Sequence, residues 1–556
     1  MKNSLLILAT FFISQYVFAS TKTWIGSTST NWSTASNWSP AAKPNNTDTV
    51  YINSASNNPI LSQNSDCLIL IMSSDAVLDL GGYQLSSSGG LTMTNASITN
   101  GSLYVIGYQP FTLTNSLIGV TILNTIGNLI ATNNVFTQPN TIKIRSFDPS
   151  YSGGNTFEKT TYISNYGEGE LFFGYDLPDM FEDSVFISTM DLTTSSTGDI
   201  HMAYNSDSNT FNGICQLDIY SASSIYFCDG SDSASVSFYS PVKIGGVLIT
   251  NAIEFSRNAH FHTGAPLGLS DLGWIAGELR LMGITMDDSL SIVMDNDENE
   301  NSILIDKGSI FSSKVNCTAQ SIYLGEVTFN DSTTFVKTGE GTDQLKSGHI
   351  KANAPFTFSN LGYGSFLSSY TDSCSFNSDI TLINANEGTI QLASFGLLNI
   401  GGNLNISTSA GLISFGEFST DTNIVQGNID LNCSGGLVVL GMIKQGNAGT
   451  INTISFENSE LDLLGYRSTN TDSLIITGTD NSRLVLNQCQ IEGPFQVELP
   501  SIVINEGIYN GNTLFHKTGN DYDQGGGSMV FHGKAHFKTS SDGDLLLNYD
   551  ESNNQF

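Results

Sequence analysis

Leu412-Ile413-Ser414-Phe415-Gly416 is one of four short, mainly apolar runs that end in glycine. The other three are Leu392-Ala393-Ser394-Phe395-Gly396, Leu437-Val438-Val439-Leu440-Gly441 and Leu461-Asp462-Leu463-Leu464-Gly465. The sequence positions of successive glycines differ by 20, 25 and 24 (416−396, 441−416 and 465−441). Similarity at a period of roughly 20 to 50 residues is typical of solenoids, because one such unit cannot bury its apolar face alone. We expect each unit to be one coil, with glycine at a bend that needs a positive φ or a close backbone approach.

Similar apolar runs occur outside this region. Leu68-Ile69-Leu70-Ile71-Met72 and Leu103-Tyr104-Val105-Ile106-Gly107 are examples, and residues such as Ser, Asn and Gly separate one run from the next. Runs of this kind suit parallel strands whose inward side chains stack from coil to coil. No segment keeps a helical period, so we expect almost no helix. The sequence predicts an all-β, single-stranded parallel β-helix, a right-handed β-solenoid with coils of about 20–30 residues.

The composition agrees with this fold. Charged residues make up only 13 % of the 556 residues, and 39 % of the residues are apolar. Ser, Thr, Asn and Gly supply the remaining polar surface, and they suit strand exteriors and turns better than helix faces. The chain is too hydrophobic to be disordered, so we expect it to bury a continuous core.

The charge balance limits the partners. Lys and Arg number 20 against 52 Asp and Glu, which gives a net charge of −32. Such a surface repels phosphate backbones and anionic lipid headgroups. We therefore expect no nucleic-acid partner, and we interpret the acidity as a means of keeping an exposed surface soluble.

The first 19 residues have the pattern of a secretory signal peptide. Lys2 supplies the positive start, Leu5 to Ile13 the apolar segment, and Val17-Phe18-Ala19 a cleavage signal before Ser20. The apolar segment is too short to anchor the chain, and no later run approaches the roughly 20 apolar residues of a membrane helix. The sequence predicts a secreted protein, extracellular or at the cell surface, without membrane insertion.

Residues 20–66 hold three of the four tryptophans, Trp24, Trp32 and Trp38. The first coil of a solenoid exposes its apolar end unless another segment covers it, and large aromatic side chains can do so. We interpret this segment as a Trp-rich N-terminal cap. The alternative is that the tryptophans form a platform on which sugars stack.

A longer repeat of about 180–195 residues lies over the coils of the predicted β-helix, residues 67–556. Ile163-Ser164-Asn165-Tyr166-Gly167 matches Phe358-Ser359-Asn360-Leu361-Gly362 at an offset of 195 (358−163). Phe335-Val336-Lys337-Thr338-Gly339 recurs as Phe515-His516-Lys517-Thr518-Gly519 at an offset of 180 (515−335). Blocks of several coils therefore repeat within the chain.

The last block of this longer repeat is incomplete. Asp343-Gln344 in one block matches Asp523-Gln524 in the next, and the pattern then stops at Phe556. A β-solenoid without a cap ends in an unpaired strand edge, which invites pairing with other chains. We therefore expect a truncated C-terminus and a longer natural protein.

Several short motifs resemble those of large secreted, repeat-rich surface proteins of the Bacteroidetes type. They are Ser152-Gly153-Gly154-Asn155-Thr156-Phe157, Asn209-Thr210-Phe211-Asn212-Gly213, the Lys-Thr-Gly runs and the opening Thr23-Trp24-Ile25-Gly26. The resemblance covers most of the chain after residue 19. It implies an adhesin-like or surface-layer role, and it carries over no catalytic residue.

Enzymes that degrade pectin also adopt right-handed β-helices, so their motifs are the main alternative. Polygalacturonase-like hydrolases share an Asn-x-Asp, an Asp-Asp, a Gly-His-Gly and an Arg-x-Lys motif. This sequence has Asp287-Asp288, but Ile350 follows Gly348-His349, and no Arg-x-Lys occurs. The motifs are incomplete, and a fold alone does not establish a function. We therefore expect no catalytic residue, and a polysaccharide lyase or hydrolase is the alternative.

The densest acidic run is the candidate calcium site. Its carboxylates are Asp295, Asp297, Glu298 and Glu300. Carboxylate and amide oxygens suit calcium, although the glycine and the distal glutamate of an EF-hand loop are missing. The alternative is a solvated loop between coils. Calcium is therefore the only cofactor that the sequence suggests.

His260 and His262 lie on one face of a predicted strand, because side chains alternate along a strand. No carboxylate or thiol stands near them at a spacing that supports metal binding, which argues against a metal site there. The seven cysteines are scattered and odd in number, so they form no disulfide framework. Cys215 and Cys228 are the one pair that could form a bridge.

Taken together, these patterns favour an exported, non-enzymatic stalk or surface module. Faces rich in Ser, Thr, Asn and Asp suit weak hydrogen bonds to extracellular glycans or to host and environmental surfaces, which multivalency would strengthen. A purely structural component of a surface layer is a further alternative, and it predicts self-association instead of ligand binding.

Overall fold

The computed structural model describes residues 20–189, 198–206, 208–220, 222–245, 249–256, 258–269, 277–294, 301–344, 349–367, 373–392, 396–416, 423–446, 448–547 and 555. The predicted signal sequence, residues 1–19, lies outside them. The described residues form an all-β parallel solenoid of about 19 turns. Their one helical element is η1, a short 3-10 turn at Ala35–Asn37. The predicted fold class is confirmed, and the predicted handedness of the coil stays a prediction.

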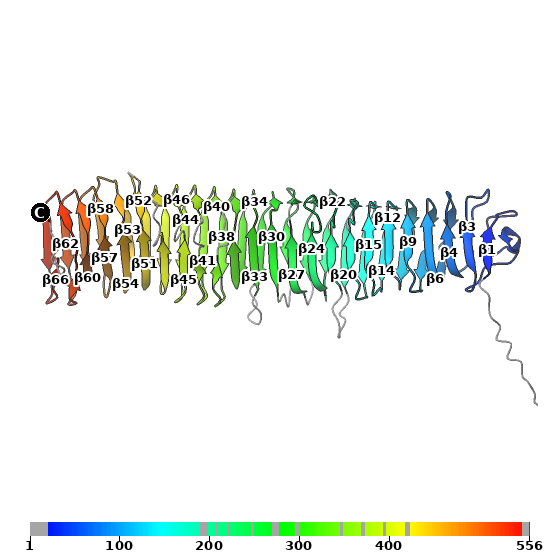
Figure 1. The fold of residues 1–556 in the computed structure, drawn as a ribbon, viewed down its shortest axis with the longest axis horizontal. Helices are drawn as coiled ribbons and strands as arrows, with labels where there is room; N and C mark the ends of the chain where they lie inside the picture. Colours follow the sequence, from blue (N-terminus) through cyan, green and yellow to red (C-terminus); the bar gives the residue numbers. More distant parts are fainter. Residues whose placement is uncertain are drawn as a thin grey trace, which may run out of the picture. The chain divides into compact units, whose positions relative to one another are not determined.

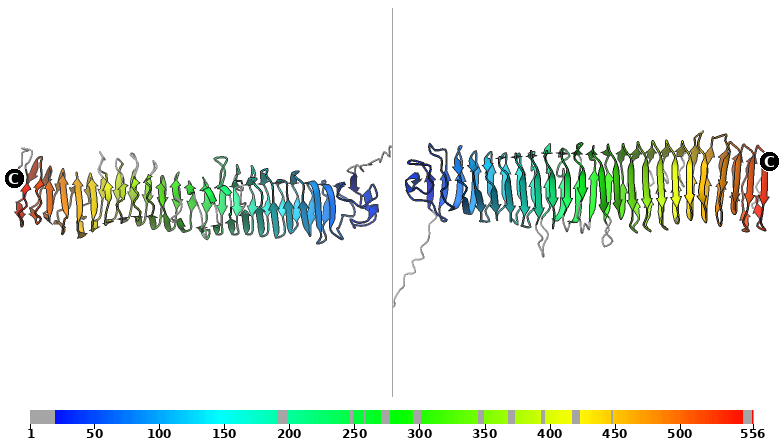
Figure 2. Two further views of the ribbon diagram at one scale, coloured as in Figure 1. Left: turned by 90° about the horizontal axis from the view of Figure 1, so that it is seen from below. Right: turned by 180° about the vertical axis from the view of Figure 1, so that it is seen from behind.

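The chain divides into two compact units, Met1–Met190 (unit 1) and Asp191–Phe556 (unit 2). Within each unit the strands of successive coils lie side by side (Figure 1). Two further views show the same rows of strands from other directions (Figure 2). Among the described residues, no helix has the length and apolar character that crossing a membrane requires.

Unit 1 begins with strands around three buried tryptophans. These strands are β1 (Thr21–Trp24), β2 (Trp38–Ser39) and β3 (Thr49–Ile52). Trp24 and Trp32 each make an edge-to-face contact with Trp38, with ring centroids 4.9 and 4.7 Å apart. Trp24, Trp32 and Trp38 are 3 %, 0 % and 1 % exposed, so they form core and offer no open platform for sugars.

The remaining strands of unit 1 form three rows of parallel strands. The first row consists of β4 (Ser65–Met72), β6 (Gln84–Thr94), β8 (Ser102–Val105), β11 (Ile122–Thr125), β14 (Asn140–Ile144), β17 (Thr161–Asn165) and β20 (Val185–Thr189). β6 also pairs with the second row, which consists of β9 (Phe111–Thr114), β12 (Leu129–Thr132), β15 (Ser150–Gly153) and β18 (Leu171–Phe173). The third row consists of β5 (Val77–Asp79), β7 (Ser97–Thr99), β10 (Leu117–Gly119), β13 (Val135–Phe136), β16 (Thr156–Phe157) and β19 (Met180–Phe181).

Unit 2 repeats the arrangement with three rows of its own. Its first row consists of β23 (Cys215–Asp218), β26 (Val242–Gly245), β29 (Leu267–Leu269), β32 (Leu290–Met294), β35 (Val315–Ala319), β38 (Thr333–Lys337), β41 (Phe356–Asn360), β44 (Ile380–Asn384), β47 (Leu404–Thr408), β50 (Ile429–Cys433), β53 (Ile451–Phe456), β56 (Leu474–Thr477), β59 (Phe495–Leu499), β62 (Thr513–Lys517) and β65 (Ala535–Thr539).

The other two rows of unit 2 follow the first in each coil. The second row consists of β21 (Ile200–Met202), β24 (Ala222–Phe227), β27 (Ile249–Phe255), β30 (Glu278–Met282), β33 (Ser302–Asp306), β36 (Ser321–Leu324), β39 (Asp343–Gln344), β42 (Phe366–Leu367), β45 (Thr389–Leu392), β48 (Leu412–Phe415), β51 (Gly436–Gly441), β54 (Ser459–Leu464), β57 (Arg483–Asn487), β60 (Ser501–Ile504), β63 (Asp523–Gln524) and β66 (Leu545–Leu546). The third row, which carries the candidate site, consists of β22 (Asn209–Phe211), β25 (Val236–Phe238), β28 (Ala259–Phe261), β31 (Thr285–Met286), β34 (Ser309–Phe311), β37 (Val327–Phe329), β40 (Ile350–Ala352), β43 (Cys374–Phe376), β46 (Leu398–Ile400), β49 (Asn423–Val425), β52 (Ile443–Gln445), β55 (Arg467–Ser468), β58 (Cys489–Ile491), β61 (Gly507–Tyr509) and β64 (Met529–Phe531).

The core of each unit is a set of columns of inward side chains. In unit 1, Phe157 stacks between Phe136 and Phe181, with ring centroids 4.5 and 4.6 Å apart. In unit 2, Phe238 stacks on Phe261 at 4.9 Å. Parallel strands in register place equivalent side chains directly above one another, so phenylalanines at equivalent positions of successive coils stack in one column.

Three of the four glycines that end the quoted runs lie where a side chain does not fit. Gly416 and Gly465 have φ values of +53° and +65°, in the left-handed region that favours glycine. A Cβ on Gly441 would lie 2.5 Å from the carbonyl oxygen of Gly416 in the preceding coil. Both expected reasons for glycine, a positive φ and a close approach of backbones, are confirmed.

Coil length varies more than the glycine spacing indicates. The register places Phe211 opposite Phe238 and Phe311 opposite Phe329, so the second of these coils is much shorter than the first. The turns account for most of the difference, because residues 228–235 separate β24 from β25, whereas only residues 325–326 separate β36 from β37. The shorter coil falls below the expected length.

The cysteines contribute to the core of the coils. All seven are buried and free, Cys215 and Cys228 included. The possible bridge between these two residues is therefore not formed in this structure.

Candidate functional site

The structure does not describe the four residues of the candidate calcium site. Asp295, Asp297, Glu298 and Glu300 lie outside the described residues. The calcium site therefore stays a prediction. The described part of the chain instead brings together histidines and a carboxylate from two successive coils of unit 2.

The outward side chains of the third row of unit 2 form two neighbouring columns. In one column, Ser237 on β25, His260 on β28 and Thr285 on β31 are paired in register. The other column consists of the residues directly after these strands, Tyr239, His262 and Asp287. Main-chain hydrogen bonds keep this second column in register, since the His262 and Asp287 amides donate to the carbonyls of Phe238 and Phe261.

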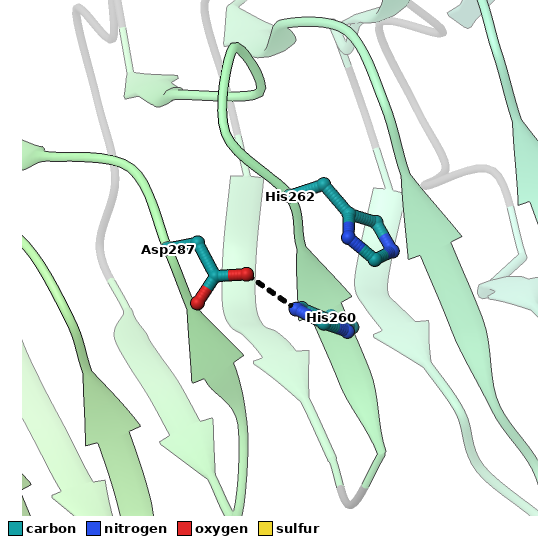
Figure 3. Close-up of side chains that lie close together, drawn as sticks. All are labelled: His260, His262 and Asp287. Carbon is teal, nitrogen blue, oxygen red and sulfur yellow. Dashed lines mark hydrogen bonds and ion pairs between the residues drawn. The ribbon is translucent and has the colours of Figure 1, made fainter.

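This arrangement places three ligand groups in one cluster, the His260–His262–Asp287 cluster (Figure 3). His260 Nε2 lies 2.8 Å from Asp287 Oδ2, and the ring N–H donates to the carboxylate. The His260 and His262 rings have centroids 3.8 Å apart. One nitrogen of each ring and one carboxylate oxygen all lie within 4.8 Å of one another.

The surroundings favour neutral imidazole and ionised carboxylate. Burial lowers the pKa of His262, and the neighbouring His260 lowers it further, while Asp287 opposes both effects. The hydrogen bond from His260 holds the pKa of Asp287 below its usual value. A neutral ring and a charged carboxylate are the states in which these groups bind metal ions.

Two further side chains hold the cluster in place. The Tyr239 ring stacks on His262 with centroids 4.1 Å apart and planes 7° from parallel. Ser312 Oγ donates to Asp287 Oδ1 at 3.1 Å. Ser312 and Tyr239 occupy the coils on either side of the cluster, so both His262 and Asp287 are oriented by packing outside the ligand set.

The expectation that no carboxylate supports the two histidines is wrong. Asp287 follows His262 by one coil in the sequence, and the stacking of the coils brings the two together. Sequence reasoning considered Asp287 only as part of the Asp287-Asp288 pair of a hydrolase. The coil period predicts the place of Asp287 if it is applied to polar residues as well as to apolar ones.

Asp288 and His349, the other residues considered for a hydrolase, do not belong to the ligand group of this cluster. Asp288 Oδ2 accepts a hydrogen bond from the Gly264 amide of the preceding coil at 2.9 Å, so its carboxylate links two coils. His349 contacts Ser373. Among the described residues, no grouping of metal-ligating side chains includes His349, nor His532 and His536, two histidines four residues apart near the end of the chain.

Unit 1 carries a second surface of interest, formed by outward aromatic rings. Tyr162 on β17 and Phe186 on β20 stack at 5.0 Å with planes 13° from parallel, and Tyr162 is 48 % exposed. We call these two residues the aromatic pair. On the second row, Tyr151 and Phe172 stack at 5.2 Å, and Tyr175 contacts both rings.

Polar side chains flank the aromatic pair on the same strands. Ser164 and Ser188 occupy the adjacent outward column, and their hydroxyl oxygens lie 2.9 Å apart. Lys143 precedes them in that column on β14. Sequence reasoning missed this surface, because Tyr162 and Phe186 belong to different coils and become neighbours only through the register.

Comparisons with protein-family models, with curated proteins and with solved structures find no match to this chain. The geometry of these two surfaces is therefore the basis for a proposed function.

Proposed function

We propose that this protein is an exported, non-catalytic cell-surface or extracellular protein that binds extracellular glycans weakly and at several points. The observation that carries the proposal is the aromatic pair, two nearly parallel outward rings on consecutive coils, of which Tyr162 is exposed and Phe186 half-buried. Large aromatic side chains usually bury their area, so outward stacked rings mark a binding surface.

The chemistry of this surface suits sugars. The C–H faces of a pyranose ring pack against a flat aromatic ring, and its hydroxyl groups need polar partners beside that ring. Tyr162 and Phe186 supply the flat surface, and the hydroxyl groups of Ser164 and Ser188 lie in the adjacent column. Repeated coils offer similar outward positions, so weak contacts to one polymer would add through multivalency.

The signal sequence and the resemblance to Bacteroidetes-type surface proteins support an adhesin-like role outside the cell. The acidic surface supports neutral or weakly charged glycans as ligands, because it repels polyuronates that lack bridging cations.

Affinity electrophoresis of the purified chain through gels that contain plant, algal and host polysaccharides tests this proposal. We expect at least one neutral polymer to retard the protein, and Tyr162→Ala and Phe186→Ala each to remove most of the retardation. Tyr104→Ala is the matched control, because Tyr104 faces outward on β8 of the same row and stacks on no aromatic ring among the described residues.

Four outcomes would contradict the proposal. If no polymer changes the migration of the protein, glycan binding is ruled out. If Tyr104→Ala loses as much retardation as Tyr162→Ala and Phe186→Ala, the aromatic pair is ruled out as the binding site. Release of reducing ends or unsaturated uronates during incubation would instead support a polysaccharide-acting enzyme. Concentration-dependent self-association without retardation would support a structural surface-layer component.

A further inference from the structure

We propose that His260, His262 and Asp287 bind one divalent first-row transition-metal ion of the zinc class, with at least one coordination position left open to solvent. The proposal rests on three ligand groups of suitable chemistry that two consecutive coils hold within 4.8 Å of one another.

The distances require only small movements. Nitrogen and oxygen ligands stand about 2.0–2.2 Å from zinc, so two ligands at a tetrahedral angle lie roughly 3.3 Å apart. His260 Nε2 and Asp287 Oδ2 are 2.8 Å apart and face one another. A metal ion between them would replace the proton of this hydrogen bond, and the two side chains would separate by about half an ångström.

The donor set selects the class of metal. Two imidazoles and one carboxylate suit zinc, copper, nickel, cobalt or iron(II), whereas calcium and magnesium bind through oxygen ligands. Catalytic zinc sites likewise combine three protein ligands with an open position, and structural zinc sites use four protein ligands. Among the described residues, no fourth metal-ligating side chain joins this cluster.

The site is accessible and yet supported. The side chains of His260 and Asp287 are 35 % and 33 % exposed, so a hydrated ion can reach them. Tyr239 stacks on His262 and Ser312 holds the second oxygen of Asp287, which reduces the motion that binding would have to arrest. A metal ion here would also link β28 directly to the coil that contains β31.

The test is a titration of the chelator-treated chain of 556 residues with Zn²⁺ by calorimetry and with Co²⁺ by visible absorption. We expect one ion per chain and the d–d absorption of Co²⁺ with nitrogen and oxygen ligands. His262→Phe keeps the ring that stacks on Tyr239 and removes its nitrogens, and Asp287→Asn keeps the side-chain shape and removes its charge.

Each of these substitutions should weaken Zn²⁺ binding by more than the roughly 10- to 100-fold loss typical of outer-shell changes. His349→Phe is the matched control, since His349 is an exposed histidine of the same unit outside the cluster, and it should bind Zn²⁺ as the native chain does. Circular dichroism establishes that each variant is folded.

Two results would overturn the proposal. One is the absence of Co²⁺ absorption and of Zn²⁺ heat in the native chain at millimolar metal. The other is binding that His262→Phe and Asp287→Asn leave unchanged, because the ion would then occupy another site. Both results are independent of glycan binding, which depends on unit 1.

Discussion

Asp179 in unit 1 shows how a single buried carboxylate is held between coils. It is fully buried and accepts hydrogen bonds from Ser152 Oγ at 2.7 Å, from the Asn155 amide at 2.8 Å and from the Gly174 amide at 2.8 Å. Asn155 in turn accepts a hydrogen bond from the Asn134 amide of the preceding coil, at 2.9 Å. The side chains thus form a ladder along the turns of unit 1, in which each coil satisfies polar groups of the coil before it.

Burial outweighs these hydrogen bonds in setting the charge of Asp179. It raises the pKa of this carboxyl from 3.8 to about 6, although each hydrogen bond acts in the opposite direction. The folded state therefore binds the proton more tightly than the unfolded state does. This contribution to stability is fully present below pH 3.8 and disappears as the pH rises to about 6.

We predict that the free energy of unfolding of unit 1 falls between pH 4 and pH 6 by about 2 kcal/mol because of Asp179. This is the larger part of the roughly 3 kcal/mol (2.2 pKa units, 6−3.8, at roughly 1.36 kcal/mol each) that the whole titration contributes, since the titration extends below pH 4 and above pH 6. Asp179→Asn should remove this fall, at a cost in stability at both pH values. Urea unfolding followed by tryptophan fluorescence measures it, because Trp24, Trp32 and Trp38 lie in unit 1.

The control for Asp179 is Asp183→Asn, which changes an exposed carboxylate nearby whose pKa is lowered, chiefly by a hydrogen bond from the Ser184 amide. The Asp183 variant should retain the fall between pH 4 and pH 6. An Asp179→Asn variant with the same fall as the native chain would contradict the assignment.

At the scale of elements, the recurring Lys-Thr-Gly motif has a structural reason. Lys337 ends β38, and its ammonium group donates to the carbonyls of Gln320 at 3.1 Å and Gly339 at 2.9 Å. The same group lies 3.5 Å from Asp343 Oδ2, with both side chains fully buried. A Cβ on Gly339 would lie 2.6 Å from the Gln320 carbonyl oxygen, so glycine is required beside the lysine.

The second copy of the motif repeats these contacts. Lys517 ends β62, donates to the carbonyls of Pro500 and Gly519, and lies 3.0 Å from Asp523 Oδ2. Asp523 also accepts a hydrogen bond from the Ile502 amide, at 2.9 Å. The Lys, the Gly and the Asp therefore recur together because they form one buried turn between rows of strands.

Removing one partner of this buried ion pair should be costly. Burial lowers the pKa of Lys337 against the attraction of Asp343, and it raises the pKa of Asp343, so desolvation is the dominant effect on both groups. We predict that Asp343→Asn lowers the free energy of unfolding by about 3–5 kcal/mol, because it leaves a buried ammonium without its counter-charge.

The double variant Lys337→Met with Asp343→Asn should be more stable than Asp343→Asn alone, since it buries no unpaired charge. Urea unfolding of the two single variants and the double variant at neutral pH measures the coupling between the residues. Additive effects would show that the two groups do not act as an ion pair. The equivalent pair at Lys517 and Asp523 should respond in the same way.

At the scale of the whole molecule, the fold could be predicted because its signal is carried by each coil separately. Runs such as Leu412 to Gly416 show a strand and a bend without reference to the rest of the chain. The candidate site could be predicted only in part. His260 and His262 belong to one coil, whereas the place of Asp287 depends on the register between coils.

That register does not follow from local sequence, since the coil from Phe311 to Phe329 is much shorter than the coil from Phe211 to Phe238. A variable coil length leaves open which outward residue of the next coil lies beside a given histidine or tyrosine. For the same reason Phe186 could not be assigned to Tyr162 beforehand. The core can be predicted without knowing the register, because many apolar residues fit the same inward column. A pair of specific outward residues cannot, because it forms only in one register.

The net charge of −32 acts on the whole chain and leads to the last prediction. Folding brings carboxylates closer together than they are in the unfolded chain, so their repulsion opposes folding. The range of this repulsion falls from about 30 Å at 0.01 M salt to about 8 Å at 0.15 M. Ion pairs near the surface, such as Arg483 with Glu460, contribute little to stability, so screening them costs little. Buried pairs such as Lys337 with Asp343 are screened still less.

We therefore predict that raising NaCl from about 0.01 to 0.15 M increases the urea midpoint of unfolding at neutral pH. Calcium chloride at matched ionic strength separates screening from binding. An equal increase would mean screening alone, and a larger increase would support calcium binding by carboxylates such as those of Asp295 and Asp297. A midpoint that stays constant or falls with NaCl would show that the acidic surface does not oppose folding. The carboxylates would then have to lie far enough apart, or close enough to basic groups, for their repulsion to be offset.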